Sequence, residues 1–278
     1  MTGLTVLQFT VLVAISALAA GLLGSLTGLG GGVVLVPLLT LGFRVDIRYA
    51  VGASLVSVIA TSSGAAAAYV REGYTNVRVG MLLEVATTIG ALAGASLALV
   101  VATRWIAVAF GLVLLHSAWA SGGQHEEHVT TGPPDPLAER LRLDSVYPTP
   151  KGLQPYRVRN VPGGFALMLV AGVLSGLLGI GAGVVKVLAM DRAMRLPFKV
   201  STTTSNFMIG VTAAASAGVY LQRGYIDPAL AMPVMLGVLS GAMVGARLLA
   251  RAGHAHSPPV APLYNIWSAM AATTAANT

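Results

Sequence analysis

Two clusters of glycine interrupt long apolar runs in this chain, and they constrain its fold more than any other feature. The first is LTGLGGG at residues 26–32, and the second is LLGIGAG at residues 177–183; a short apolar piece follows each cluster. The surrounding runs are long enough to cross a bilayer, which takes about 20 residues. Glycine clusters should break the helix inside the membrane, where free backbone groups must line a cavity or be buried in protein. The pattern therefore indicates transport.

The composition places these runs in a membrane protein. Hydrophobic residues make up 55% of the chain and charged residues 10%, against roughly 25% charged residues in soluble domains. The absence of cysteine excludes disulfides and thiolate metal sites. The net charge of +7 does not indicate nucleic-acid binding, because the 17 Lys and Arg residues are scattered between apolar runs. We therefore predict an all-α polytopic membrane protein.

The apolar runs and the polar segments between them predict the order of elements. Helices are expected at about residues 4–25, 49–70, 79–101 and 106–121, with a short apolar piece at 33–43. The first helix lacks a charged n-region and an A-x-A site, so we interpret it as a retained membrane helix. Residues 122–160 are polar and proline-rich, which predicts a linker with a short surface helix at 136–143. The predicted units are thus residues 1–121, 122–160 and 161–278.

The two halves of the chain are copies of each other. An offset of 151 residues holds without a gap from Gly21 to Leu97, and it matches glycines, serines, threonines and tyrosines across the halves: Gly28/Gly179, Gly30/Gly181, Gly32/Gly183, Ser54/Ser205, Thr61/Thr212, Tyr69/Tyr220, Tyr74/Tyr225, Gly90/Gly241 and Gly94/Gly245. Agreement of this kind indicates an internal duplication, which is typical of secondary transporters.

Charge counting indicates how the repeats are oriented. If each glycine cluster is the tip of a hairpin followed by about three transmembrane helices, sixteen Lys and Arg residues divide 12 to 4 between the two sides, with Lys186 left out as intramembrane. If each broken segment crosses the membrane once, they divide 8 to 8. The positive-inside rule favours the uneven division. This predicts two inverted repeats, a cytoplasmic linker and both termini outside.

The helix breaks are the candidate substrate site. A helix that starts at a break presents unpaired N–H groups and the positive end of its dipole, which suit an anion. Glycine also lets the backbone approach a ligand closely. The candidate residues here are Gly30, Gly31, Gly32, Gly181, Ala182 and Gly183. The alternative is close helix packing, which we favour for Gly90/Gly94 and Gly241/Gly245.

Two charged residues lie within the apolar runs. Lys186 follows the second cluster at the position that Leu35 holds in the first half, and an intramembrane lysine is a functional hypothesis by default. Its alternatives are snorkelling to the interface or a structural pair with Asp191 or Glu84. Glu84 is a candidate for proton coupling, but an interfacial carboxylate paired with Arg78 or another arginine is the favoured interpretation.

Polar side chains on two helices are candidates to complete the site. Ser54, Ser57 and Thr61 share one helical face, and Thr204, Ser205 and Asn206 open the equivalent helix of the second half. Their hydroxyl and amide groups can donate to an oxyanion, and the alternative is hydrogen bonding between helices. The run His125-Glu126-Glu127-His128 is interpreted as solvated loop, so no metal or other cofactor is predicted.

Several runs resemble the sulfite exporter TauE/SafE family, also called the 4-toluene sulfonate uptake permease family. They are GLLGSLTGLGGG at 21–32 with Pro37, AVGASL at 50–55, IGALAGA at 89–95, GLLGIG at 176–181, TSN at 204–206 and GYID at 224–227. The likeness covers about residues 10–252. It implies an inner-membrane carrier of bacteria or archaea for sulfite, a sulfonate or another sulfur-containing organic anion. The chain departs from the family pattern at Ala53, Ala182 and Leu188.

Other functions remain as alternatives. No H-E-x-x-H or G-x-S-x-G motif is present, so we do not predict an enzyme. An anion channel or a carrier of carboxylates would use the same lining groups. The expected partners are a small anion and the lipid bilayer, and a homodimer is compatible with the sequence.

Overall fold

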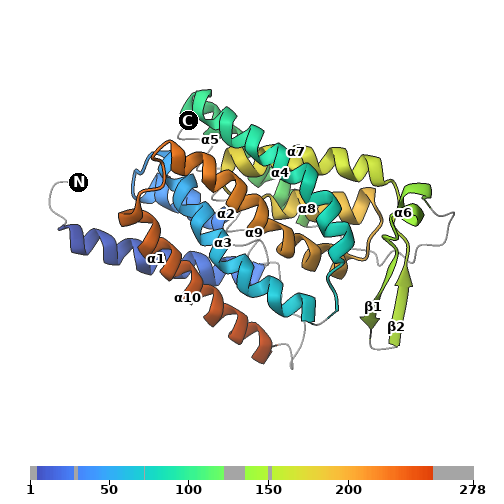
Figure 1. Cartoon of the computed structure of the whole chain (residues 1–278). Coiled ribbons are helices and arrows are strands. Elements are labelled where there is room, and N and C mark those ends of the chain that lie inside the picture. Colours follow the sequence, from blue (N-terminus) through green and yellow to red (C-terminus); the bar gives the residue numbers. More distant parts are fainter. Residues whose placement is uncertain (1–4, 28–30, 72, 122–134, 150–151, 253–278) are drawn as a thin grey trace.

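The computed structural model describes residues 5–27, 31–71, 73–121, 135–149 and 152–252, and it forms a bundle of helices with a small two-stranded sheet at one end (Figure 1). The first half contains α1 (Val6–Thr27), α2 (Gly32–Pro37), the π-helix η1 (Leu38–Gly42), α3 (Ile47–Arg71), α4 (Val77–Val100) and α5 (Thr103–Ser121). The middle segment contains α6 (Pro136–Arg140), β1 (Ser145–Thr149) and β2 (Gly152–Tyr156). The second half contains α7 (Val161–Leu178), α8 (Gly183–Leu188), the π-helix η2 (Ala189–Ala193), α9 (Phe198–Gln222) and α10 (Pro228–Ala252).

The prediction of a polytopic helical membrane protein is confirmed. Among the described residues, α1, α4, α7 and α10 each contain a segment long and apolar enough to cross a membrane. Shorter apolar stretches lie in α3 and α5 and across α2 and η1. The long helices α3 and α9 pack against each other and carry the predicted hydroxyl groups. The expected last segment at 260–275 lies outside the described residues.

Each half opens with a hairpin whose two arms return to the same end of the bundle. In the first half, the Phe9 ring near the start of α1 packs edge-on against the Phe43 ring just after η1, with centroids 5.7 Å apart. In the second half, the Arg159 N–H before α7 donates to the Met194 carbonyl just after η2, at 3.0 Å. The ends of α1 and α7, and the starts of α2 and α8 that follow them, therefore lie at the far ends of these hairpins.

The element bounds repeat at the same offset of 151 residues as the sequence. Helix α3 (47–71) corresponds to α9 (198–222), and α2 with η1 (32–42) corresponds to α8 with η2 (183–193). Arg44 and Arg195, which end the two hairpins, both have positive φ, at 55° and 58°. The start of α3 meets the turn after α9, where Tyr49 contacts Tyr225, and the start of α9 meets the turn after α3, where Lys199 contacts Tyr74. Helices α3 and α9 therefore run antiparallel.

Glycines bring the outer helices into backbone contact. Gly237 of α10 lies against Ala14 and Leu18 of α1, and Gly241, one turn later, lies against Leu18 and Leu22. The two helices therefore run in the same direction, side by side (Figure 1). Helices α4 and α7 make the equivalent contact in the other half of the bundle. Close packing, which we expected for Gly90, Gly94 and Gly241, is confirmed, because a Cβ on any of them would lie within 2.2 Å of a carbonyl oxygen on the neighbouring helix.

The segment predicted as a polar linker is more ordered than expected over residues 135–149 and 152–158, which we call the cap. The short surface helix is confirmed as α6, but β1 and β2 also form an antiparallel hairpin. Tyr147 and Tyr156 on one face of this hairpin are buried, in a cluster with residues of α4, α7, η2 and α9. Pro148 and Pro155 argue against strands in the sequence, yet both strands of a two-stranded sheet are edges, where proline is tolerated.

Candidate functional site

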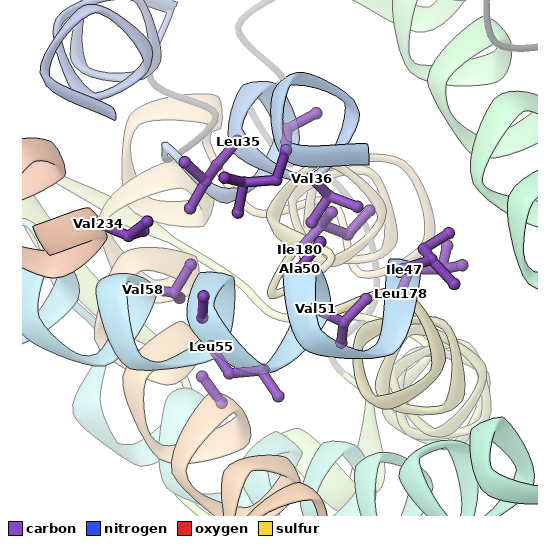
Figure 2. Packing of buried hydrophobic residues seen from close by; sticks show 14 of the residues in the cluster. Leu35, Val36, Ile47, Ala50, Val51, Leu55, Val58, Leu178, Ile180 and Val234 are labelled. Carbon is purple, nitrogen blue, oxygen red and sulfur yellow. The ribbon is translucent and has the colours of Figure 1, made fainter. Parts of the chain in front are cut away.

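The two helix breaks come together in the centre of the bundle. Ser54 of α3 donates a hydrogen bond of 2.9 Å to the Gly179 carbonyl at the second break. A Cβ on Gly32, which begins α2 after the first break, would lie 2.7 Å from Ser54 Oγ and 3.4 Å from the Gly179 carbonyl oxygen. Figure 2 shows Leu35 and Val36 of α2 near Ile180 of the second break, in one cluster with residues of α3. Glycine at position 32 is thus what permits the close approach.

The second break has a left-handed backbone at three positions. Gly179 and Gly181 have φ of +67° and +70°, a conformation that glycine adopts without a steric penalty. Ala182 also has positive φ, at 46°, although its Cβ disfavours that region. Gly31, its counterpart in the first half, is right-handed with φ of −64°. The two backbones therefore differ at this pair of positions, and Ala182 holds strain of the kind that collects at functional sites.

Lys186 lies one turn beyond the second break and is fully buried. Its Nζ donates a hydrogen bond of 2.6 Å to Thr212 Oγ1 of α9. Thr212 Oγ1 donates in turn to Glu84 Oε1 of α4, at 2.8 Å. The bonded group Lys186–Thr212–Glu84, which we call the charged triplet, therefore joins the two halves of the chain. Of the alternatives considered for Lys186, the structure shows a connection to Glu84 through the Thr212 hydroxyl.

Glu84 does not pair with Arg78, so the favoured sequence interpretation is wrong. Arg78 Nη1 donates to the Arg142 carbonyl of the cap instead. Thr88, one turn later on α4, contributes a second hydroxyl to Glu84 Oε1, at 3.3 Å. The other carboxyl oxygen, Oε2, is buried and has no hydrogen-bond partner among the described residues. Position 84 faces the protein interior and not the interfacial arginines that the sequence pattern suggested.

The remaining predicted site residues serve mainly as structural contacts in this conformation. Ser57 donates to the Ala53 carbonyl of its own helix, and Ser205 donates to the Gly183 carbonyl, at 3.3 Å. Thr204 accepts the Asn76 N–H at the start of α4. Asn206 is half-buried on α9 beside them. A Cβ on Gly181 or Gly183 would meet the Ile209 side chain, and Gly30 lies outside the described residues.

Sequence reasoning missed two features of this region. The sequence placed Thr212 about two turns after Ser205 on the same helix. Its position between Lys186 and Glu84 depends on how α9 packs against α4 and α8. Ser175 is a fully buried serine one turn before Gly179, and its hydroxyl has no partner within the described part of the chain. A buried hydroxyl without a partner marks a place where a ligand or water can bind. Its counterpart in the first half is Gly24, so the duplication gave no signal for it.

Other parts of the molecule do not add to this site. A cavity of about 220 Å³ lies between α2, η1, α3 and α5, lined mainly by apolar residues such as Val36, Pro37 and Phe110. No group of three or more His, Cys, Asp or Glu side chains suited to a metal occurs in the described residues. The run His125-Glu126-Glu127-His128 lies outside them.

The charged triplet lies beside the second break and supplies groups of the kind that bind anions. A buried ammonium group supplies positive charge, and hydroxyls nearby supply neutral donors. Lys186 is fully buried, so electrostatic interactions there are stronger than at a surface.

The chain resembles known membrane transporters over most of its length. The family profile described as Sulfite exporter TauE/SafE matches residues 13–271. The probable membrane transporter protein YunE of Bacillus subtilis (strain 168) is 26% identical over 249 residues, which cover 87% of this chain and 89% of that protein. The probable membrane transporter protein YdhB of the same organism is 25% identical over 232 residues, covering 82% and 85%. A probable membrane transporter protein of Xylella fastidiosa (strain 9a5c) is 24% identical over 240 residues, covering 84% and 80%. No solved structure matches the chain significantly.

Proposed function

Because this chain belongs to the sulfite exporter TauE/SafE family and is a multi-pass membrane transporter of that type, we propose that it is a secondary carrier for small anions. The proposed cargo is sulfite, an organosulfonate or another sulfur-containing organic anion. The proposed location is the cytoplasmic (inner) membrane, with the cap and the rest of residues 122–160 on the cytoplasmic side. The anion binds between the two helix breaks, within reach of Lys186.

The buried position of Lys186 is the observation that carries this proposal. A lysine in the membrane interior is costly and needs a counter-charge, and its exposed fraction here is 0%. It follows directly on the break whose backbone is left-handed at Gly179, Gly181 and Ala182. An anion that entered this region would find a fixed positive charge, and hydroxyl groups such as Ser54 and Ser175 lie close to the same break.

The relation between the halves supports alternating access. Since α3 and α9 run antiparallel and each half is an offset copy of the other, the two halves have opposite directions, as in inverted repeats. A contact between a cation and a tyrosine ring closes each end of this helix pair. At one end, the Arg48 guanidinium lies 5.8 Å from the centre of the Tyr225 ring, and at the other, the Lys199 ammonium lies 4.3 Å from the centre of the Tyr74 ring. In the proposed cycle these closures open in turn.

The test is binding and counterflow with the purified full-length protein. Wild type is screened by thermal shift against sulfite, sulfate, thiosulfate, sulfoacetate, taurine and acetate, since a ligand at about 100 times its Kd stabilises by about 2.7 kcal/mol. We expect at least one sulfur anion to raise Tm, and Lys186→Met to abolish the shift and the uptake. Arg192→Met is the matched control, because it removes an exposed cation of η2 that lies six positions after Lys186 in the sequence.

Three results would change the proposal. Undiminished uptake by Lys186→Met would refute the role of the lysine. A shift with acetate and with no sulfur anion would assign a carboxylate as cargo. In proteoliposomes a carrier exchanges labelled anion against a gradient and a pore does not, so uptake without counterflow would identify an anion channel.

A further inference from the structure

The charged triplet has no charged counterpart in the other half of the molecule. The offset of 151 residues relates Lys186 to Leu35 and Glu84 to Met235, while Thr212 corresponds to Thr61. Thr61 donates to carbonyls of its own helix. Leu35 is as fully buried as Lys186. The fold therefore accommodates apolar side chains at the equivalent positions, and packing alone does not explain the two charges.

An anion that binds at this site would compete with the Glu84 carboxylate for Lys186. Thr212 Oγ1 accepts from Lys186 Nζ at 2.6 Å, and Glu84 Oε1, at 2.8 Å, is the nearest acceptor for its one proton, with the Met208 carbonyl next at 3.0 Å. An anion that binds Lys186 replaces Glu84 as the counter-charge. The carboxylate would then be left in a buried position without compensation, which is strongly unfavourable. Protonation of Glu84 removes that cost.

We infer that Glu84 is the internal counter-ion of Lys186 and carries one proton for each anion that the protein transports. This inference rests on the proposed function and specifies how the same site is coupled. The proton binds at Oε2, because Oε1 already accepts hydrogen bonds from Thr212 and Thr88, whereas Oε2 has no partner in the described structure.

The charge balance defines the transport cycle. In the empty carrier, the ammonium of Lys186 and the carboxylate of Glu84 neutralise each other. When a monovalent anion and a proton enter from the same side, the ammonium pairs with the anion and Glu84 becomes neutral. Both cross, both leave on the other side, and the ion pair forms again. Transport of a monovalent anion is therefore electroneutral symport with one proton.

In the described residues, α4, α7 and α9 carry no other charged side chain that contacts Glu84. Helix α7, which packs along α4, has no titratable side chain. On α9, Lys199 contacts Tyr74 at one end and Tyr220 donates to the Gly176 and Leu177 carbonyls at the other. On α4 itself, Arg78 donates to the cap. Among the described residues, Lys186 is the cation connected to Glu84, through the Thr212 hydroxyl.

A double-mutant cycle without substrate tests the counter-ion assignment. Lys186→Leu and Glu84→Met each introduce the residue of the other half and leave one buried charge unpaired, so each should lower Tm in detergent by roughly 10 °C. The double variant reproduces the apolar pair and should recover most of that loss. Additive losses in the double variant would show that the two charges do not compensate each other and would overturn the inference.

Proton movement in proteoliposomes tests the coupling. The probes are sulfite and methanesulfonate, the second because it stays a monoanion over the working pH range, and an internal pH-sensitive dye reports protons. Wild type should acidify the vesicle with anion uptake, without net current. Glu84→Gln should keep exchange of labelled for unlabelled anion within about twofold, but lose dye acidification and show net uptake about tenfold slower or more, since its empty form has an uncompensated lysine.

The outcomes separate the two proposals. Failure of wild type to bind or exchange either probe would count against the proposed function, whatever the double-mutant cycle shows. Exchange with retained acidification in Glu84→Gln would refute the proton-carrier role and leave the anion carrier intact. A wild-type current with no acidification would refute the coupling as well.

Discussion

The contact between α4 and α7 gives a prediction whose size can be worked from the structure. A Cβ added at Gly94 would lie 2.0 Å from the Val173 carbonyl oxygen and 2.8 Å from its carbonyl carbon. Ordinary C···O contacts are about 3.3 Å or longer, so Gly94→Ala must move the two backbones apart by about 1.3 Å at this point. Neither backbone can yield by a rotamer change.

The cost follows from that separation. A gap of about 0.5–1 Å already forfeits a quarter to a half of each dispersion contact, and overpacking typically costs about 1–3 kcal/mol. We expect the upper end, about 3 kcal/mol, for Gly94→Ala. In a chain of this size 1 kcal/mol shifts Tm by roughly 2–4 °C, so Tm should fall by roughly 6–12 °C. Thermal unfolding of the purified protein in detergent, followed by fluorescence, measures it.

A matched glycine on another helix is the control. Gly218 of α9 has no atom within 4 Å of its added Cβ, and alanine is favoured over glycine in a helix by about 1 kcal/mol. Gly218→Ala should therefore leave Tm unchanged or raise it slightly. Gly241→Ala, in the equivalent contact with α1, should lower Tm about as much as Gly94→Ala. Equal melting of Gly94→Ala and Gly218→Ala would refute the reasoning.

Three further predictions concern the first break and the cap. Gly32→Ala puts a Cβ 2.7 Å from Ser54 Oγ, so it should reduce transport more than about tenfold by separating the breaks, measured as initial uptake at equal protein. Tyr156→Phe removes the hydrogen bond that Asn76 Nδ2 donates to the tyrosine oxygen, and should cost about 1 kcal/mol of stability in thermal unfolding, whereas an unchanged Tm would show that water replaces it. Hydrogen bonds from the N–H groups of α7 and α6 lower the pKa of Asp135 below 3.8; because that stabilisation is present above the ordinary pKa and lost as pH falls through the lowered one, Asp135→Ala should melt below wild type at pH 7 and the difference should shrink below about pH 4.

Much of the helical architecture could be predicted because its cause is local. The first-half helices lie within a few residues of their expected bounds, and α7 begins at Val161, where the polar segment ends. Glycine clusters broke the helices where expected, because glycine lacks the side chain that favours continuous helix. The cap hairpin was not predicted, because burial of Tyr147 and Tyr156 against the bundle, and not strand propensity, stabilises it.

The candidate site was less predictable because its contacts are made between the halves. The sequence identified Lys186 and Glu84 as unusual, but it favoured a surface arginine as the partner of Glu84. The bond through Thr212 joins residues 128 positions apart, and periodicity carries no information on such pairing. Ser54 and Thr204 were predicted as ligand groups, yet the Gly179 carbonyl and the Asn76 N–H occupy them here.

The charged triplet also has a consequence for biogenesis. Glu84 is synthesised about a hundred residues before Lys186, and a chain is made and inserted from its N-terminus. Helix α4 therefore reaches the bilayer while its counter-charge does not yet exist, and burial of an unpaired carboxylate there is costly. Full docking of α4 must wait for α8, so the first half completes its assembly only when the second half arrives, and each half expressed alone would retain an orphan charge.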